Sequence, residues 1–92
     1  MTYMWCLTRV KDFTQWKAVF DSHEEAHREA GLGLVKIWRS IEEPNNIFFL
    51  FEVASQEKAQ AFIDDPVSAR AGEEAGVVDG EYRFVEDAGG YA

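Results

Sequence analysis

Residues 47–51 read IFFLF, and this run limits the possible folds more than any other feature of the chain. A strand with one face in solvent alternates apolar and polar side chains. This run does not alternate, so the strand is expected to be covered on both faces. Upstream lie the turn sequence EEPNN and a further strand-like run, LGLVKIWRSI. The pattern predicts a hairpin whose strands are residues 32–41 and 47–53.

A first helix is predicted between Lys11 and Gly31, because apolar residues recur there at three- and four-residue steps. Asp12 is a candidate N-cap, with Gln15 placed for a capping box, and Gly31 or Gly33 is expected to end the helix. The residues of its apolar side are Phe13, Trp16, Val19, Phe20, Ala26 and Ala30.

A second helix is predicted after Ser55, its candidate N-cap, with Ala59, Phe62 and Ile63 turned inward. The Asp65-Pro66 pair should break this helix and restart it, since proline suits the first position of a new helix. Gly76 should close the second piece.

Strands are also predicted at residues 2–10 and 81–87, which gives the order β-α-β-β-α-β over one domain, residues 1–92, with 87–92 as a loose tail. Right-handed crossovers fold this order into a ferredoxin-like α+β plan. In that plan a four-stranded antiparallel sheet has two helices on one face and the first and third strands at its centre. The other face needs a cover, and a second copy of the chain is the simplest one, so a homodimer with its sheets face to face is expected.

The net charge is −8, from 17 acidic and 9 basic residues. Nucleic-acid binding and attachment to an anionic membrane need clustered positive charge, so neither is expected. Cys6 is the single cysteine, which excludes an intramolecular disulfide. The chain starts with no secretory signal and contains no apolar run long enough to span a membrane, so cytoplasmic residence is expected.

Residues 23–27 read HEEAH and fit the H-E-x-x-H pattern of zinc peptidases. On a helical wheel, however, His23 and His27 lie on the apolar side, while Glu24, which would have to activate the water, lies at the solvent margin. The extended pattern would need a glycine and a third histidine, where the chain has Ala30 and Gly33. The match is interpreted as a coincidence, and neither a metal site nor a cofactor is predicted.

The inward histidines leave two readings open. Each imidazole could hydrogen-bond a backbone carbonyl or a neighbour such as Glu52 and simply complete the core. Alternatively, one of them shuttles a proton on a bound ligand, since histidine titrates near neutral pH. His23 is the better candidate for this role, because His27 lies closer to the helix end.

Large rings are numerous for so short a chain, and they are usually core residues but can also line a slot for a flat ligand. Arg39 and Arg83 lie among apolar strand residues and could anchor an acidic group or extend to the edge of the sheet. The rings in question are Trp5, Trp16, Trp38, Phe49, Phe51 and Tyr82.

The segments VKDFTQWKAVFDSH, WRSIEEPNNIFFLFEV and AQAFIDDPVSARAGEEAGV resemble small proteins of the dimeric α+β barrel superfamily, from about residue 4 to residue 86. That group includes antibiotic-biosynthesis monooxygenases that need neither metal nor flavin, polyketide cyclases, isomerases and haem-degrading enzymes. The resemblance implies a ligand slot between helices and sheet, walled here by Trp16, Phe20, His23 and His27. The haem degraders use a histidine late in the second helix, and this chain has none between Ser55 and Gly76.

The leading hypothesis is a homodimer that binds a hydrophobic, flat or polyketide-like molecule, with cyclisation or isomerisation by proton transfer as its chemistry. His23 would be the acid/base and His27 its partner. Two alternatives remain, a cofactor-independent monooxygenase and a non-catalytic binding or assembly module. The candidate ligand-binding residues are Trp16, Phe20, Trp38, Phe51, Tyr82 and Arg39.

Overall fold

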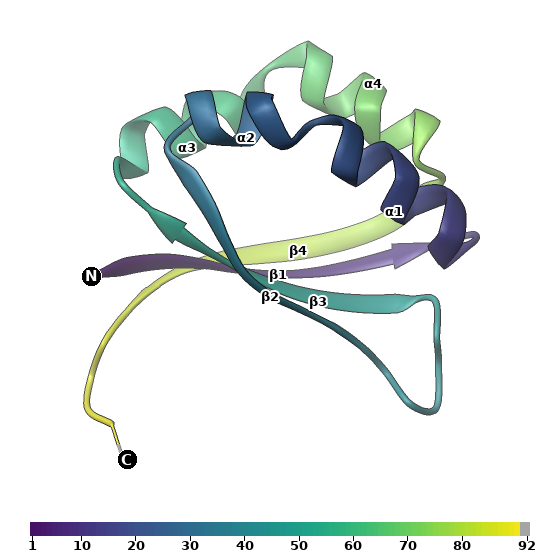
Figure 1. Cartoon of the computed structure of the whole chain (residues 1–92), viewed down its shortest axis with the longest axis horizontal. Helices are drawn as coiled ribbons and strands as arrows, with labels where there is room; N and C mark the ends of the chain where they lie inside the picture. The colour runs from purple at the N-terminus through teal and green to yellow at the C-terminus, as the bar shows by residue number, and fades with distance from the viewer. Residues whose placement is uncertain (91–92) are drawn as a thin grey trace.

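The computed structural model of the chain describes residues 1–90. Figure 1 shows a single sheet with all the helices stacked on one side of it. The elements in chain order are β1 (Thr2–Val10), α1 (Phe13–Ser22), α2 (Glu24–Glu29), β2 (Leu32–Arg39), β3 (Asn46–Val53), α3 (Gln56–Asp64), α4 (Pro66–Glu74) and β4 (Val77–Glu86).

The four strands form one antiparallel sheet in the order β2-β3-β1-β4. The predicted ferredoxin-like α+β fold is confirmed, and β1 and β3 are the central strands, as the IFFLF run indicated. At the middle of the sheet Cys6 of β1 lies between Phe49 of β3 and Tyr82 of β4. The side chains of these three residues point to the face of the sheet that the helices cover.

The predicted helix starts are confirmed by their capping bonds. The Asp12 carboxylate accepts a hydrogen bond from the backbone N–H of Gln15 at 2.9 Å, and the Ser55 hydroxyl accepts one from that of Lys58 at 3.2 Å. The capping box itself does not form. The Gln15 side chain donates instead to the carbonyl of Glu74 at 2.8 Å and so ties the start of α1 to the end of α4.

The first helix is broken, whereas the periodicity predicted one continuous helix. α1 ends at Ser22, α2 starts at Glu24, and His23 lies between them with φ −101° and ψ 14°. No proline or glycine causes this break. The Ser22 hydroxyl donates to the carbonyl of Val19 at 2.6 Å and so competes with the backbone for that acceptor, which is a known cause of helix bending. The second break is the predicted one, at Asp65-Pro66.

The last strand is longer than predicted. It starts at Val77 rather than Glu81, because Gly76 ends α4 and Val77 at once pairs with Val10 of β1. Residues 87–90 of the predicted tail have no regular secondary structure, and residues 91 and 92 lie outside the described part of the chain. β2 ends at Arg39, two residues before the predicted boundary.

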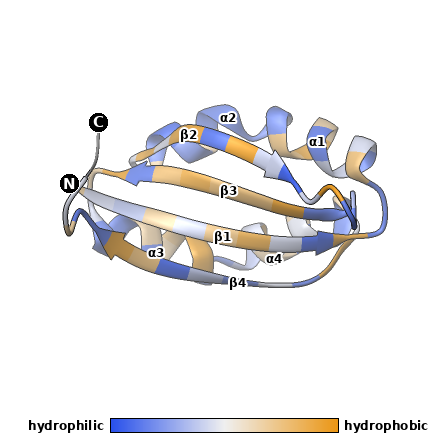
Figure 2. Ribbon diagram, turned by 90° about the horizontal axis from the view of Figure 1, so that it is seen from below, coloured by the Kyte–Doolittle hydropathy of each residue, from blue (hydrophilic) through white to orange (hydrophobic). Residues whose placement is uncertain are grey.

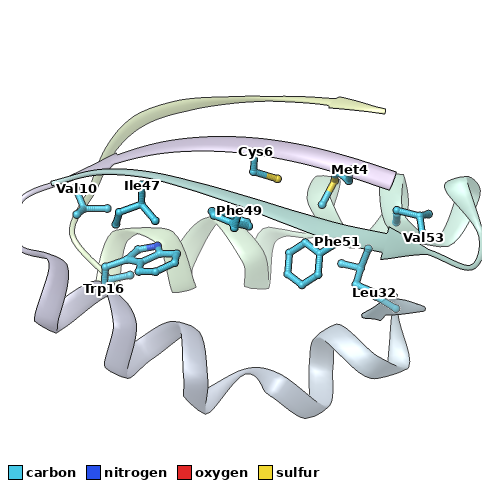
Figure 3. Close-up of a cluster of buried hydrophobic side chains, with 12 residues drawn as sticks. Met4, Cys6, Val10, Trp16, Leu32, Ile47, Phe49, Phe51 and Val53 are labelled. Atoms are coloured by element: carbon cyan, nitrogen blue, oxygen red, sulfur yellow. The ribbon is translucent and has the colours of Figure 1, made fainter. Parts of the chain in front are cut away.

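The core lies between the sheet and the helices. Side chains of β1 and β3 alternate between the two faces, and those on the helix side are buried beneath Trp16 of α1. Figure 3 shows Trp16, Phe49 and Phe51 between β3 and the α1–α2 segment. The helix-side members from the central strands are Met4, Cys6, Val10, Ile47, Phe49, Phe51 and Val53.

The other face of the sheet has no helix over it, as Figure 2 shows. Four apolar side chains from three strands, Trp5, Trp38, Phe48 and Leu50, form a patch there, which we call the open-face patch. Trp5 pairs with Leu50 and Trp38 with Phe48 across neighbouring strands, and the rings of Trp5 and Phe48 lie 6.3 Å apart. Within one protomer, β3 is therefore covered on its helix side only.

Candidate functional site

A cavity of about 500 Å³ lies between the helices and the sheet, and we call it the main cavity. Ligand pockets in proteins span roughly 300–1,000 Å³ and are mostly apolar, and this cavity matches both criteria. Its walls come from α1, α2, α3 and α4 above and from all four strands below, with β2 contributing Leu32. The cavity occupies the position that the resemblance implied.

The main cavity exists because α4 presents small side chains to the sheet. Ser68, Ala71, Gly72 and Ala75 all line it, so the space that longer side chains would fill stays empty. The sequence signal is the segment SARAGEEAG, whose small residues predict a helix but not the cavity beneath it.

Stacked aromatic rings form the wall on the α1 side. The rings of Trp16 and Phe20 lie 4.6 Å apart in a stacked arrangement, and Phe20 stacks over Phe51 at 6.0 Å. Phe49 meets both helix rings, at 5.6 Å from Trp16 and 5.3 Å from Phe20. Trp16, Phe20 and Phe51, all predicted ligand-binding residues, are brought together here. Such a wall suits a flat apolar ligand.

His27 lies among three phenylalanine rings, at 4.8 Å from Phe20, 5.2 Å from Phe51 and 5.6 Å from Phe62. Within residues 1–90 neither ring nitrogen has a hydrogen-bond partner, and neither is sealed from solvent-accessible space. An imidazole in this state can bond a ligand without first breaking a bond to the protein.

Burial lowers the pKa of His27 below its usual value of 6.5, and the nearby charge of His23 lowers it further, while Glu24 opposes the change. The neutral imidazole is therefore the form favoured at neutral pH. A neutral imidazole can accept a proton, which is the requirement for a general base.

His23 also lines the main cavity and is half-buried. Its backbone N–H donates to the carbonyl of Phe20 at 3.1 Å, and its carbonyl accepts from the N–H of His27 at 3.0 Å. The expected structural partner Glu52 is exposed and pairs with Tyr3 and Gly33, so its side chain lies on the face of the sheet away from the helices. It does not satisfy either imidazole.

Tyr82, one of the predicted ligand-binding residues, lines the main cavity from β4. Its hydroxyl oxygen accepts a hydrogen bond of 3.1 Å from the side-chain amide of Gln60, whose other contacts are with the carboxylate of Asp64. Because the amide is the donor, the phenolic proton of Tyr82 remains available to a ligand. The sequence did not predict that Gln60 and Asp64 would support Tyr82 at the cavity. Their i, i+4 spacing on α3 is the one sequence feature that indicates a contact between them.

Trp38 and Arg39 do not line the main cavity. Trp38 is 45% exposed on the open face. The Arg39 guanidinium lies 4.0 Å from the ring centre of Phe13, and its Nε donates to the carbonyl of Pro44 at 3.0 Å, which places it beside the β2–β3 loop. The two residues therefore lie in different environments, both outside the main cavity. The guanidinium of Arg39 packs against the ring of Phe13.

Cys6 was not expected at the site, yet it lines the main cavity from β1. Its side chain is buried, and burial raises the pKa of the thiol to about 12. The thiol is therefore neutral and a poor nucleophile, since the thiolate is the reactive form. Cys6 contributes an apolar surface to the cavity floor.

The H-E-x-x-H match does not assemble a metal site in the described residues, where no three His, Cys, Asp or Glu side chains gather closely enough to hold an ion. Glu24 is exposed and paired with Arg28 at 3.2 Å.

Among residues 1–90, which the structure describes, no helix is long and apolar enough to cross a membrane.

The sequence matches no protein-family model and no curated protein. Solved structures do match. A protein from Bordetella bronchiseptica proposed to be an antibiotic biosynthesis monooxygenase superposes with a TM-score of 0.76 at 12% identity, over 95% of this chain and 96% of that one. The chain shares its ferredoxin-like α+β fold. At such low identity the likeness extends to the fold alone.

Two further structures illustrate the range of these neighbours. A NIPSNAP family protein of unknown function from Agrobacterium tumefaciens has a TM-score of 0.71 at 18% identity, over 96% of this chain and 88% of that one. A protein from Deinococcus radiodurans, also proposed to be an antibiotic biosynthesis monooxygenase, has a TM-score of 0.68 at 11% identity, over 100% and 97%. The ferredoxin-like proteins that this chain resembles therefore carry more than one family name.

Proposed function

We propose that the protein binds a flat, mainly apolar molecule in the main cavity and acts on it by proton transfer, as a cyclase or isomerase of aromatic or polyketide-like compounds. One observation carries this proposal. Two imidazoles without protein hydrogen-bond partners line an apolar cavity of about 500 Å³. Their nitrogens are open to solvent-accessible space, so a ligand in the cavity can take the place of water as their hydrogen-bond partner.

We assign the role of base to His27 rather than His23, which reverses the ranking made from the sequence. His27 is held by three aromatic rings, and its pKa is lowered, so that it is fixed in position and neutral. His23, at the junction of α1 and α2, is placed to orient the ligand or share the proton. Tyr82 would donate its phenolic proton to a carbonyl or hydroxyl of the ligand.

The second candidate function is that of a cofactor-independent monooxygenase acting in the same cavity. Several structural neighbours are described as antibiotic biosynthesis monooxygenases, which favours it. Consumption of one substrate under nitrogen and under air separates the two functions, because only the oxygenase requires O₂. A non-catalytic binding or assembly module is the third possibility, and it predicts binding without turnover in either atmosphere.

Homodimerisation belongs to the same proposal. The open-face patch carries two tryptophans, a phenylalanine and a leucine, and no helix of the protomer covers it. Exposed apolar patches of this kind mark interaction surfaces, and a second sheet packed face to face would bury them. The dimer would also complete the cover that the IFFLF run led us to expect for β3.

Binding can be tested with a matched pair of variants at Gly72. An added Cβ at Gly72 would lie 3.9 Å from the side chain of Val77, an ordinary contact, so α4 tolerates a side chain there. Gly72→Leu should project into the main cavity and abolish binding of a flat phenol such as 1-anthrol, measured by isothermal titration calorimetry. Gly72→Ala adds a single methyl group and should weaken binding far less.

Equal binding by Gly72→Leu and the wild-type protein would place the phenol elsewhere and refute the assignment of the main cavity. Once a substrate is known, His27→Phe, which keeps a ring among the three phenylalanines, should abolish turnover while the ligand still binds. Retained turnover would remove His27 from the mechanism.

A further inference from the structure

A second cavity, of about 470 Å³, lies on the outer side of the α1–α2 segment, above β2. We call it the side pocket. Its rim carries charged residues of α1 and α2, Asp21, Glu24 and Arg28, and its strand side includes Leu34 of β2. It therefore differs from the main cavity, which is walled mostly by apolar groups.

The two cavities share four lining residues: Phe20, His27, Leu32 and Phe51. These residues form the partition between them. His27 is the only one of the four with an ionisable group, whereas His23 lines the main cavity alone. The His27 ring thus borders an apolar space on one side and a polar-rimmed space on the other.

We propose that the side pocket is the route by which solvent water exchanges protons with His27 while a ligand occupies the main cavity. The inference rests on the proposed base role of this residue. In each cycle the neutral ring would take a proton from the ligand on one nitrogen and become imidazolium. The proton on its other nitrogen would then pass to water in the side pocket, which restores the neutral ring. In an isomerisation the same water returns a proton to the ring when the ring protonates the product, so that no proton is gained or lost over the cycle.

A base enclosed by an apolar ligand needs such a route, because the ligand excludes water from the cavity in which the reaction takes place. From β3 and α3 the rings facing His27 are Phe51 and Phe62, which exchange no proton. Glu73 of α4 and Glu81 and Tyr82 of β4 also line the main cavity, on which the ligand would lie. The charged or titratable groups of the α1–α2 segment around His27 are His23 at the helix junction, Asp21 of α1, and Glu24 and Arg28 of α2. Three of the four lie on the side-pocket rim.

The test measures deuterium exchange at the C2 carbon of each imidazole by mass spectrometry, which follows the access of solvent to each histidine separately. Leu34→Trp should fill the side pocket and slow exchange at His27 several-fold while leaving His23 unchanged. Gly72→Leu, which fills the main cavity, should slow exchange at His23 and leave His27 nearly unchanged. Leu34 is 46% exposed, so the larger ring has room.

Leu34→Ala provides an independent check, because it enlarges the side pocket and should speed exchange at His27. The proposal is overturned if Gly72→Leu slows both histidines while neither Leu34 variant alters His27, since solvent would then arrive through the main cavity. Cooperative unfolding of each variant, followed by circular dichroism, shows that its fold is intact. None of these measurements needs a ligand, so failure here is distinct from failure of 1-anthrol to bind.

Discussion

The imidazole of His27 meets the ring of Phe51 edge-on, with the ring centres 5.2 Å apart and the planes at 62°. Phe51 is 3% exposed, so the histidine rests on a fixed part of the core. This position would suit an apolar side chain equally well, and yet the nitrogens of His27 stay open to solvent-accessible space. The contact thus orients the ring and disfavours its charged form at the same time.

This environment gives the stability of the protein a defined pH dependence. The pKa of His27 is lowered in the folded chain, whereas in the unfolded chain it returns to about 6.5. Below that pH the unfolded chain binds more protons than the folded one, so the free energy of unfolding should fall as the pH drops through about 6.5. It should level off only below the folded-state pKa.

Urea unfolding at a series of pH values from about 7.5 to about 5 measures this effect, since carboxylates titrate mainly below that range. His27→Phe should remove the His27 component, and His23→Gln should keep most of it, because burial is the largest cause of the lowered pKa. Identical pH profiles for wild type and His27→Phe would show that the histidine is not desolvated as the structure indicates.

The fold was predictable because its signals are local. The Asp12, Ser55 and Asp65 caps and the apolar periodicity fixed the element order, and that order leaves few topologies. The break at His23 was not predictable, because it depends on which acceptor the hydroxyl of Ser22 selects. Even so, both histidines remained on the inner side that the helical wheel indicated.

Trp38 and Arg39 show where prediction of the site failed. If β2 alternated regularly from Leu32, Trp38 would face the helices. The pairing register shifts between Leu34 and Lys36, and this irregularity moves Trp38 to the open face. A one-residue shift reverses every later side chain, and nothing in LGLVKIWR marks it.

The presence and volume of the main cavity could not be predicted from the sequence either. The sequence shows that α4 carries small residues, but whether space remains depends on how far the helix lies from β1 and β4. Gly72 and Ala75 line the cavity, whereas the large rings that line it from the helix layer, Trp16, Phe20 and Phe62, belong to α1 and α3. Cavities follow from three-dimensional packing rather than from any single segment.

Cys6 should be almost inert towards alkylation in the native protein. Its side chain is 6% exposed, and the pKa of its thiol is raised to about 12, so the reactive thiolate is scarce at neutral pH. We expect iodoacetamide to modify it slowly without denaturant and rapidly in urea, with glutathione at the same pH as the reference. Labelling of the native protein at the rate of glutathione would show that the floor of the cavity opens to solvent.

Gly80 should be far less replaceable than Gly33, although both are exposed glycines in strands. A Cβ at Gly80 would lie 2.6 Å from the carbonyl oxygen of Leu7, a backbone atom that cannot turn aside, whereas a Cβ at Gly33 would meet nothing within 4 Å. We expect Gly80→Ala to lower the free energy of unfolding by about 1–3 kcal/mol, as overpacking does.

Gly33→Ala should change the free energy of unfolding by no more than about 0.5 kcal/mol, as for most surface substitutions. Thermal and urea unfolding of the two variants provide the comparison. Equal stabilities would mean that β4 does not approach β1 as closely at Gly80 as the structure places it.

Replacement of Trp38, a member of the open-face patch, provides the most direct test of the proposed dimer. Trp38 is 45% exposed in the protomer and pairs with Phe48, so its replacement leaves the helix-side core untouched. If a second sheet covers the patch, Trp38→Lys would place a charge in a desolvated interface and remove a large ring. Tryptophans at the centre of such interfaces contribute about 2 kcal/mol or more, so the dimer dissociation constant should rise at least ~30-fold.

Ile41→Lys is the matched control. Ile41 is 93% exposed in the β2–β3 loop and is not one of the four patch residues, and Ile41→Lys introduces the same charge. Sedimentation equilibrium should show a dimer for the wild type and for Ile41→Lys, and a monomer for Trp38→Lys at the same micromolar concentration. Because the main cavity lies wholly on the helix side, a Trp38→Lys monomer that still binds 1-anthrol would separate dimerisation from ligand binding. A dimer that survives Trp38→Lys with undiminished affinity would mean that the two sheets do not meet through this patch.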